Sequence, residues 1–320
     1  MEKIRIPDTE LELSPIGFGC VNAGLKWDKK EADYLFDAFL DMGGNVYDTA
    51  RVYSDWIPPE IGRSERVLGD WLARSKKREQ TIVITKGGHP DMTCSSPDRH
   101  KSRVSREEMR RDVDLSLKTL RTDYIDIYFY HRDNESIPTE ELIETMEEFV
   151  KAGKIRYYAC SNWTTQRMEA ADKYCREKGY RGFVANQALY NVGYAYMDPL
   201  ADDTMLSIDT PMRRYHEKNF RNLAMPYMGV CGGFFNKLLK EGEQSVKDSP
   251  YYTEDNVRMA RQIEHIMEKY QVTATQAVLG FFTCQDFACL PLYGPRDVES
   301  LQEACKTFDV SFTKEDYVLE

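Results

Sequence analysis

Residues 125–160 read IDIYFYHRDNESIPTEELIETMEEFVKAGKIRYYAC, and this stretch decides the fold. Its two ends, 125–130 and 155–160, are short runs rich in aromatic and β-branched residues, which favour buried strands. Between them, apolar residues recur at helical spacing and stop before a glycine: Leu142, Ile143, Met146, Phe149 and Val150, then Gly153. The order strand, helix, strand predicts a βαβ unit with parallel strands.

The same alternation extends along the chain in both directions. It predicts eight strands, at residues 16–20, 45–48, 81–86, 125–130, 155–160, 183–186, 223–227 and 287–292. Eight such units at this length fit one closed barrel better than an open sheet, and no flexible linker divides them. We therefore expect residues 1–320 to form a single (β/α)8 TIM barrel. The segment KIRIPDTELELS predicts a β-hairpin before the barrel, and the irregular region 197–250 predicts a long loop or insertion.

Composition narrows the class of partner. The net charge of −10 would repel a polyanion, so we expect no nucleic-acid partner. The eight cysteines form no C-x-x-C pair and the five histidines show no metal spacing, which predicts reduced, mostly buried thiols and no metal site. The N-terminus lacks the apolar run of a signal peptide, and the longest uncharged run, 182–197, contains Asn and Gln. These features predict a cytoplasmic protein without membrane contact.

Polar residues stand where three neighbouring strands end. Asp48, Lys86 and His131 end the second, third and fourth predicted strands, and Tyr53 follows in the loop after Asp48. Active sites of (β/α)8 barrels lie at the carboxyl ends of the strands. Side chains alternate along a strand, so the residues two and four positions earlier should also face inward. All five are apolar, as a packed barrel interior requires: Val46, Ile82, Ile84, Ile127 and Phe129.

These four residue types suit carbonyl reduction. Hydride attack on a carbonyl builds negative charge on oxygen, which must receive a proton. Tyr53 could donate it, Lys86 is expected to lower the tyrosine pKa, and Asp48 would hold the lysine. His131 could give the oxygen a second hydrogen bond. Taken singly, each residue has a plainer structural role, such as a turn cap or a solvated loop lysine, but together they favour a catalytic site.

The stretches around these residues resemble the aldo-keto reductase family. The matching segments are GGNVYDTARVY, GRSERVLGDWL, LRTDYIDIYFYHRD, KAGKIRYYACSNW, VANQALYN and LPLYGPRDVESLQEA, which span nearly the whole chain. The resemblance implies Asp48, Tyr53, Lys86 and His131 as catalytic residues. It also implies a nicotinamide cofactor bound without a Rossmann fold, and the chain indeed has no G-x-G-x-x-G after a strand.

The resemblance further assigns the cofactor contacts. It places Gly19 near the nicotinamide ribose, and Ser161, Asn162 and Gln187 at the carboxamide. It stacks Tyr227 on the ring, and it sets Arg296 at the adenosine 2′-phosphate and Glu303 at the adenine. Met228 and Ala304 depart from the family pattern, in which a serine and an asparagine are usual. Arg296 makes NADP(H) the expected cofactor in preference to NAD(H).

We therefore predict reduction of an aldehyde or ketone, including sugar-like ones, to an alcohol, with Tyr53 as the general acid. Trp56 and Trp163 are the expected substrate-pocket residues, because aromatic rings in loops above the strands would line it. Two alternatives stay open. One is a catalytically silent, cofactor-binding barrel that serves as a regulatory or interaction subunit. The other is a barrel hydrolase or isomerase with a metal or phosphate site, for which Gly229, Gly232 and Gly233 offer a candidate loop.

Overall fold

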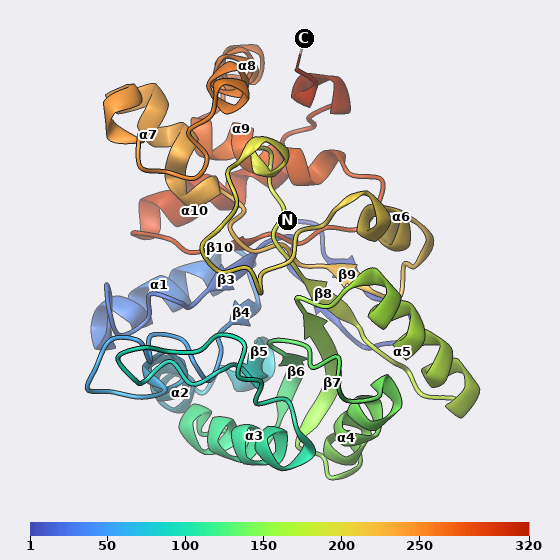
Figure 1. The fold of residues 1–320 in the computed structure, drawn as a ribbon. Coiled ribbons are helices and arrows are strands. Elements are labelled where there is room, and N and C mark those ends of the chain that lie inside the picture. Colours follow the sequence, from blue (N-terminus) through green and yellow to red (C-terminus); the bar gives the residue numbers. More distant parts are fainter. Residues whose placement is uncertain (320) are drawn as a thin grey trace.

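Eight short parallel strands curl into a barrel with helices on the outside (Figure 1). The computed structural model describes residues 1–319. Around the barrel the strands run in the order β10-β3-β4-β5-β6-β7-β8-β9. The strands are β3 (Gly17–Gly19), β4 (Val46–Asp48), β5 (Ile82–Gly87), β6 (Ile125–Tyr130), β7 (Ile155–Ser161), β8 (Ala185–Gln187), β9 (Leu223–Ala224) and β10 (Leu292–Tyr293). The predicted (β/α)8 barrel is confirmed, and β9 is shorter than the predicted strand 223–227.

The barrel closes between β9 and β10 through an irregular segment. Cys289 forms an isolated bridge with Ala224. The amides of Leu290 and Leu292 donate to the carbonyls of Ala224 and Pro226. The regular strand β10 therefore begins later than the predicted strand 287–292. Pro291 explains the difference in part, because its nitrogen carries no hydrogen for a ladder bond.

Ten α-helices surround the barrel within residues 1–319. They are α1 (Lys29–Asp41), α2 (Arg63–Ser75), α3 (Arg106–Leu120), α4 (Thr139–Lys151), α5 (Thr165–Lys178), α6 (Thr210–Lys218), α7 (Phe234–Glu241), α8 (Glu254–Tyr270), α9 (Ala274–Gly280) and α10 (Val298–Lys306). The first six each follow one barrel strand in the sequence. Helices α7, α8 and α9 fall between β9 and β10 and share a hydrophobic cluster that includes Phe235, Ile263 and Val278.

The region 197–250 is not one long loop or insertion. It contains α6 and β9, which are regular parts of the barrel, as well as α7. Helix α6 begins with an ordinary N-cap. The Asp209 side chain accepts a hydrogen bond from the Met212 amide, and a proline lies in the first turn. The apolar periodicity of α6 is weak in the sequence, because few of the nine residues of this helix are buried, namely Met212, Tyr215 and His216. The connection before α6, residues 197–209, is irregular as expected, and shorter irregular links at 219–222, 225–230 and 246–250 join the other elements.

An N-terminal hairpin, β1 (Ile4–Arg5) paired antiparallel with β2 (Glu12–Leu13), confirms the predicted one. It packs against the barrel interior, because one buried cluster joins its apolar side chains to those of the strands. Members of this cluster are Ile6, Leu11, Leu13, Val46, Ile84, Ile127, Phe129, Ala159, Leu290 and Leu292. The inward direction predicted for β4, β5 and β6 is therefore confirmed.

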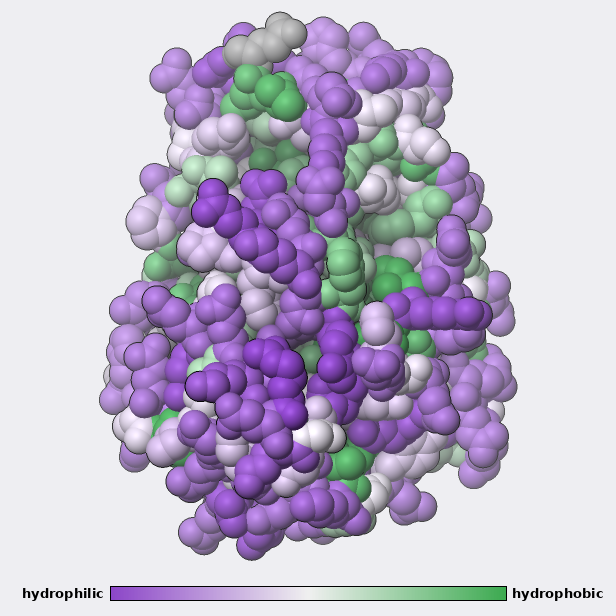
Figure 2. Space-filling view, turned by 90° about the vertical axis from the view of Figure 1, so that its right-hand side faces the viewer, coloured by the Kyte–Doolittle hydropathy of each residue, from purple (hydrophilic) through white to green (hydrophobic). Residues whose placement is uncertain are grey.

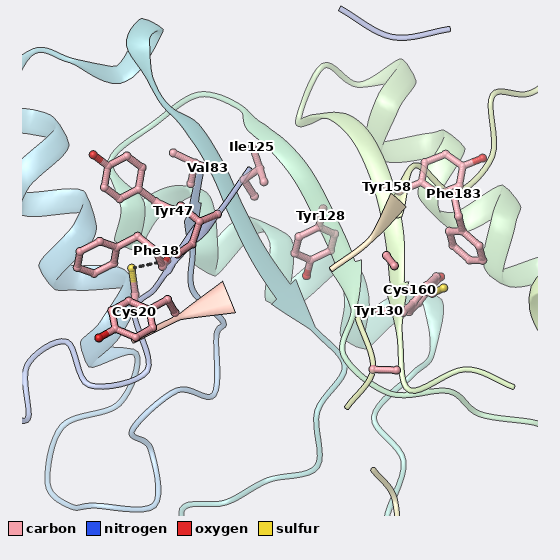
Figure 3. Packing of buried hydrophobic residues seen from close by; sticks show 14 of the residues in the cluster. Phe18, Cys20, Tyr47, Val83, Ile125, Tyr128, Tyr130, Tyr158, Cys160 and Phe183 are labelled. Carbon is pink, nitrogen blue, oxygen red and sulfur yellow. Dashed lines mark hydrogen bonds between the residues drawn. The ribbon is translucent and has the colours of Figure 1, made fainter. Parts of the chain in front are cut away.

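The outward strand residues pack against the helices (Figure 3). Phe18 of β3 and Tyr47 of β4 stack with ring centroids 5.9 Å apart. Around the barrel at β7, Tyr158 meets Phe183 edge to face at 5.7 Å on the same outward side of the sheet. Alternation thus gives each strand two buried faces, one toward the interior and one toward the helices.

The surface follows the charge-rich composition. Hydrophilic side chains cover most of the face shown in Figure 2, with small apolar areas between them. All eight cysteines are free and seven are buried, as expected. Among residues 1–319, no helix combines the length and the apolar character that a membrane crossing requires.

Candidate active site

The inward positions at the strand ends converge on one cavity of about 450 Å³. Each faces the same way as the residue two positions earlier, which belongs to the barrel interior, because successive side chains of a strand alternate between its two faces. The cavity is lined by these strand-end residues: Gly19, Asp48, His131, Ser161, Gln187, Tyr227 and Gly294. Lys86 lies just behind the wall and is 1% exposed.

The four predicted catalytic residues are in contact. The Lys86 ammonium donates to Asp48 Oδ2 at 2.8 Å and to the Tyr53 hydroxyl at 2.9 Å. The ring of Tyr53 meets the ring of His131 edge to face, with centroids 5.7 Å apart. One buried lysine therefore joins the carboxylate to the hydroxyl, and that hydroxyl and the histidine lie along the same cavity.

Local hydrogen bonds place Tyr53 over the strand ends. The chain turns after β4, and the Tyr53 amide donates to the Ala50 carbonyl at 3.1 Å. The Arg51 amide in the same turn donates to the Lys86 carbonyl, also at 3.1 Å. The turn is thus attached to the end of β5, so the tyrosine and the lysine keep a fixed separation.

Burial sets the charge states of the site. It raises the pKa of Tyr53 well above its usual value, and the Asp48 carboxylate raises it further. The lowering of this pKa that we expected from Lys86 is not found: burial dominates, and the cation that acts to lower the pKa is Arg132. Burial, with His89 and Arg132, holds the pKa of His131 well below its usual value. At neutral pH the tyrosine is therefore protonated and the histidine is neutral, so both can donate a hydrogen bond.

The residues expected at the nicotinamide form a second polar set. Asn162 accepts from the Leu206 amide and from the Tyr227 hydroxyl, and it donates to Ser161 Oγ at 3.0 Å. Gln187 donates to Asp48 Oδ1 at 2.8 Å. Gln187 therefore links this polar set directly to the catalytic residues.

Comparison with known proteins agrees with this geometry. The family model described as Aldo/keto reductase family matches residues 15–318. The chain belongs to the aldo/keto reductase family. A relative in Bacillus subtilis (strain 168), the uncharacterized oxidoreductase YrpG, is 26% identical over 98% of this chain and 93% of its own length. The aryl-alcohol dehydrogenase [NADP(+)] of Phanerodontia chrysosporium is 26% identical over 97% of this chain and 82% of its own.

A further relative matches more closely over a shorter stretch. The aldo-keto reductase YhdN of Bacillus subtilis (strain 168) is 36% identical over 53% of this chain and 49% of its own length. Family membership makes this chain an oxidoreductase of a family that acts on small carbonyl compounds. It also removes the metal- or phosphate-dependent hydrolase or isomerase from consideration.

This aldo/keto reductase places the two predicted pocket tryptophans differently. Trp56 lines the cavity and is 44% exposed. Trp163 does not line it, and its assignment to the substrate pocket is wrong. Its ring is fully buried between Tyr130 and Phe183, and its indole nitrogen donates to the Arg132 carbonyl. The Trp163 ring packs in the layer between strands and helices, outside the barrel interior and away from the cavity.

The two residues expected at the adenosine lie outside the cavity of this aldo/keto reductase. Arg296 is exposed just before α10, and Glu303 is half-buried on that helix. The cavity reaches Gly294, two residues before Arg296. Their roles toward a 2′-phosphate and an adenine stay predictions.

Two ionisable cavity residues of this aldo/keto reductase, His89 and Arg132, were not predicted from the sequence, nor were several apolar ones such as Met205. The ring of His89 lies 4.7 Å from that of His131, and the Arg132 side chain lies beside it. Both follow predicted catalytic residues closely, three positions after Lys86 and one after His131. Their position just after strand ends could have predicted them, because the loop residues that follow the strands of a barrel contact its substrate.

Proposed function

We propose that this aldo/keto reductase uses NADP(H) to reduce an aldehyde or ketone to an alcohol, with Tyr53 as the general acid. The observation that carries the proposal is the Lys86 ammonium, which contacts both Asp48 and the Tyr53 hydroxyl within 2.9 Å beside the cavity. A catalytically silent barrel would have no need for this buried charge pair, whose desolvation is costly.

The cavity suits a nicotinamide. The described contacts leave the side-chain oxygen Oε1 of Gln187 and the hydroxyl hydrogen of Ser161 uncommitted, and these match the donor and acceptor of a carboxamide. Tyr227 would give the ring an aromatic surface. The turn through Gly229, Val230 and Gly232 lines the cavity and would approach the pyrophosphate. NADPH, when bound, supplies the hydride to the carbonyl carbon.

The protein residues then handle the proton and the developing charge. Tyr53 transfers its hydroxyl proton to the carbonyl oxygen, and Lys86 stabilises the tyrosinate left behind. His131 donates a hydrogen bond to the same oxygen. Asp48 keeps the lysine charged, against the burial that lowers the lysine pKa. A proton from solvent restores Tyr53, so the products are an alcohol and NADP⁺.

Arg296 is the proposed reason for NADPH rather than NADH. It is exposed at the start of α10, and it forms no ion pair with the described residues. An exposed guanidinium without an ion-pair partner can bind a phosphate through paired, charge-assisted hydrogen bonds.

The test is titration of the purified protein with NADPH and with NADH by protein fluorescence, followed by turnover of aldehydes. We expect tighter binding of NADPH and consumption of NADPH with aldehyde. Tyr53→Phe should bind NADPH within about threefold of the wild type and lose roughly 10²- to 10⁴-fold in kcat. Tighter binding of NADH would refute the Arg296 assignment, and full activity of Tyr53→Phe would refute the general acid. Binding of neither nucleotide would overturn the function itself.

A further inference from the structure

The wall of the catalytic cavity carries one positive charge, that of Arg132, whose carboxylate partner Asp202 lies outside the cavity lining. Among the described side chains that line it, Asp48 and Arg132 are the ionised ones at neutral pH. Burial lowers the pKa of His131 well below its usual value and that of His89 to about 4, so both rings are neutral. Asp48 is balanced by Lys86 at 2.8 Å. The guanidinium of Arg132 therefore sets the charge that a substrate meets.

Arg132 is held beside the reacting centre. It directly follows His131, and its Nη1 donates to the His131 carbonyl at 2.9 Å. Its side chain is only 12% exposed. Its charge reaches across the cavity, since it acts to lower the pKa of Tyr53 on one side and of Tyr227 on another. An anion bound at Arg132 would lie close to the carbonyl that Tyr53 and His131 polarise.

The protein leaves part of this guanidinium free. Nη2 meets Asp202 at 3.2 Å and Nε donates to Thr204 at 2.9 Å, both in the connection before α6. These bonds and the one to the His131 carbonyl use three of the five N–H donors of the guanidinium. Asp202 itself does not line the catalytic cavity and is shared with Arg99 at 3.6 Å. Arg132 can therefore keep its anchor and still present N–H groups to a bound anion.

We propose that Arg132 binds an anionic group of the substrate, so that the preferred substrate is a small aldehyde or ketone that carries a carboxylate. This inference rests on the reductase function proposed above. A carboxylate matches the planar fork of a guanidinium and gains from the low exposure of the site. The substrate must be small because the cavity of about 450 Å³ also has to hold the nicotinamide.

The test compares two aldehydes of nearly equal shape, para-formylbenzoate and the neutral para-formylbenzamide, with NADPH. We expect the wild type to favour the carboxylate by about tenfold or more in kcat/KM. Arg132→Met should lower kcat/KM for the carboxylate by roughly 10- to 100-fold, mainly through KM. It should change the amide by less than about threefold.

Two further variants separate recognition from structure. Asp202→Asn removes the carboxylate that competes for Arg132, and it should lower KM for para-formylbenzoate about threefold without affecting the amide. Arg99→Met is the matched control, because Arg99 contacts Asp202 but does not line the catalytic cavity. It should leave the amide unchanged, and it should not lower KM for para-formylbenzoate, because Asp202 then pairs with Arg132 alone. If Arg132→Met does not fold, Arg132→Lys takes its place and should retain part of the preference for the carboxylate.

Each contrary result has its own meaning. Equal loss for both aldehydes in Arg132→Met would show that the arginine only holds the 202–204 connection, and the inference would be wrong. A wild type that reduces the amide as well as the carboxylate would also overturn it, while leaving the reductase function intact. A wild type that binds NADPH but reduces neither aldehyde would overturn the proposed function together with this inference.

Discussion

The two ends of the barrel interior are built from the same strands but hold opposite kinds of residue. At the hairpin end, Leu11 and Leu13 are at most 1% exposed and pack against Val46 of β4. Two residues further along β4, Asp48 is equally buried but carries a charge that only Lys86 balances. Apolar burial stabilises by roughly 25 cal/mol per Å², whereas a buried ion pair often gives no net stability. The hairpin end therefore stabilises the fold, whereas the other end holds the residues proposed for catalysis.

The largest effect should come from breaking the charge pair at the catalytic end. Lys86→Met leaves the Asp48 carboxylate buried without its cation, which should cost about 3–5 kcal/mol of unfolding free energy. It should also lower kcat by at least about 10²-fold, because Tyr53 loses its partner. Urea unfolding and NADPH consumption measure the two effects.

A double variant sharpens this prediction. Asp48→Asn combined with Lys86→Met removes both charges, so stability should return to near that of the wild type while activity stays lost. A double variant as unstable as Lys86→Met alone would show that packing, and not the unpaired charge, caused the loss.

The hairpin end should respond in the opposite way. Leu13→Ala removes a fully buried side chain, which should cost about 2–4 kcal/mol of unfolding free energy and leave kcat of the folded protein unchanged. Glu12→Ala, an exposed position on the same strand, is the control and should change stability by less than about 0.5 kcal/mol. A large fall in kcat for Leu13→Ala would contradict the separation of the two ends.

The smallest effect concerns pH. Burial lowers the pKa of His89 at the cavity and of His216 on α6 to about 4. The unfolded chain binds a proton at each histidine below about pH 6.5, whereas the folded protein does so only near its lowered pKa. The stabilising contribution is therefore complete above about pH 6.5 and is lost as the pH falls toward 4. Between pH 7 and pH 5.5 each histidine should remove about 1 kcal/mol of stability.

The histidine variants distinguish the catalytic end from the rest of the fold. His89→Gln and His216→Gln should each reduce the pH dependence of urea unfolding by about 1 kcal/mol. Only His89→Gln should also change kcat/KM, because His216 bonds to the Asn222 carbonyl and does not line the cavity. An equal change in kcat/KM for both would argue against this distinction.

Most of the site could be predicted because its residues end strands. Asp48, Lys86 and His131 follow apolar residues at a spacing of two, which fixes their direction once the strands are recognised. Tyr53 follows in the loop after Asp48. The family motifs added Gly19, Ser161, Gln187 and Tyr227, and the structure places the first three at the inward ends of their own strands.

Other features depended on contacts between distant segments. Trp163 stands only two residues beyond Ser161, yet the rings of Tyr130 and Phe183 enclose it. The raised pKa of Tyr53 likewise follows from burial by several loops, which the residue type does not reveal.

The barrel, most of its strands and helices, and the four proposed catalytic residues could be predicted from the sequence alone. These follow from local periodicity and from residues that end strands. Which loop side chains reach the cavity, and which partners their charges have, depends on contacts that form when the chain folds. The contact of Arg132 with Asp202, 70 residues away, shows why. Such a contact depends on how two loops meet above the barrel, and no periodicity within either loop encodes that meeting.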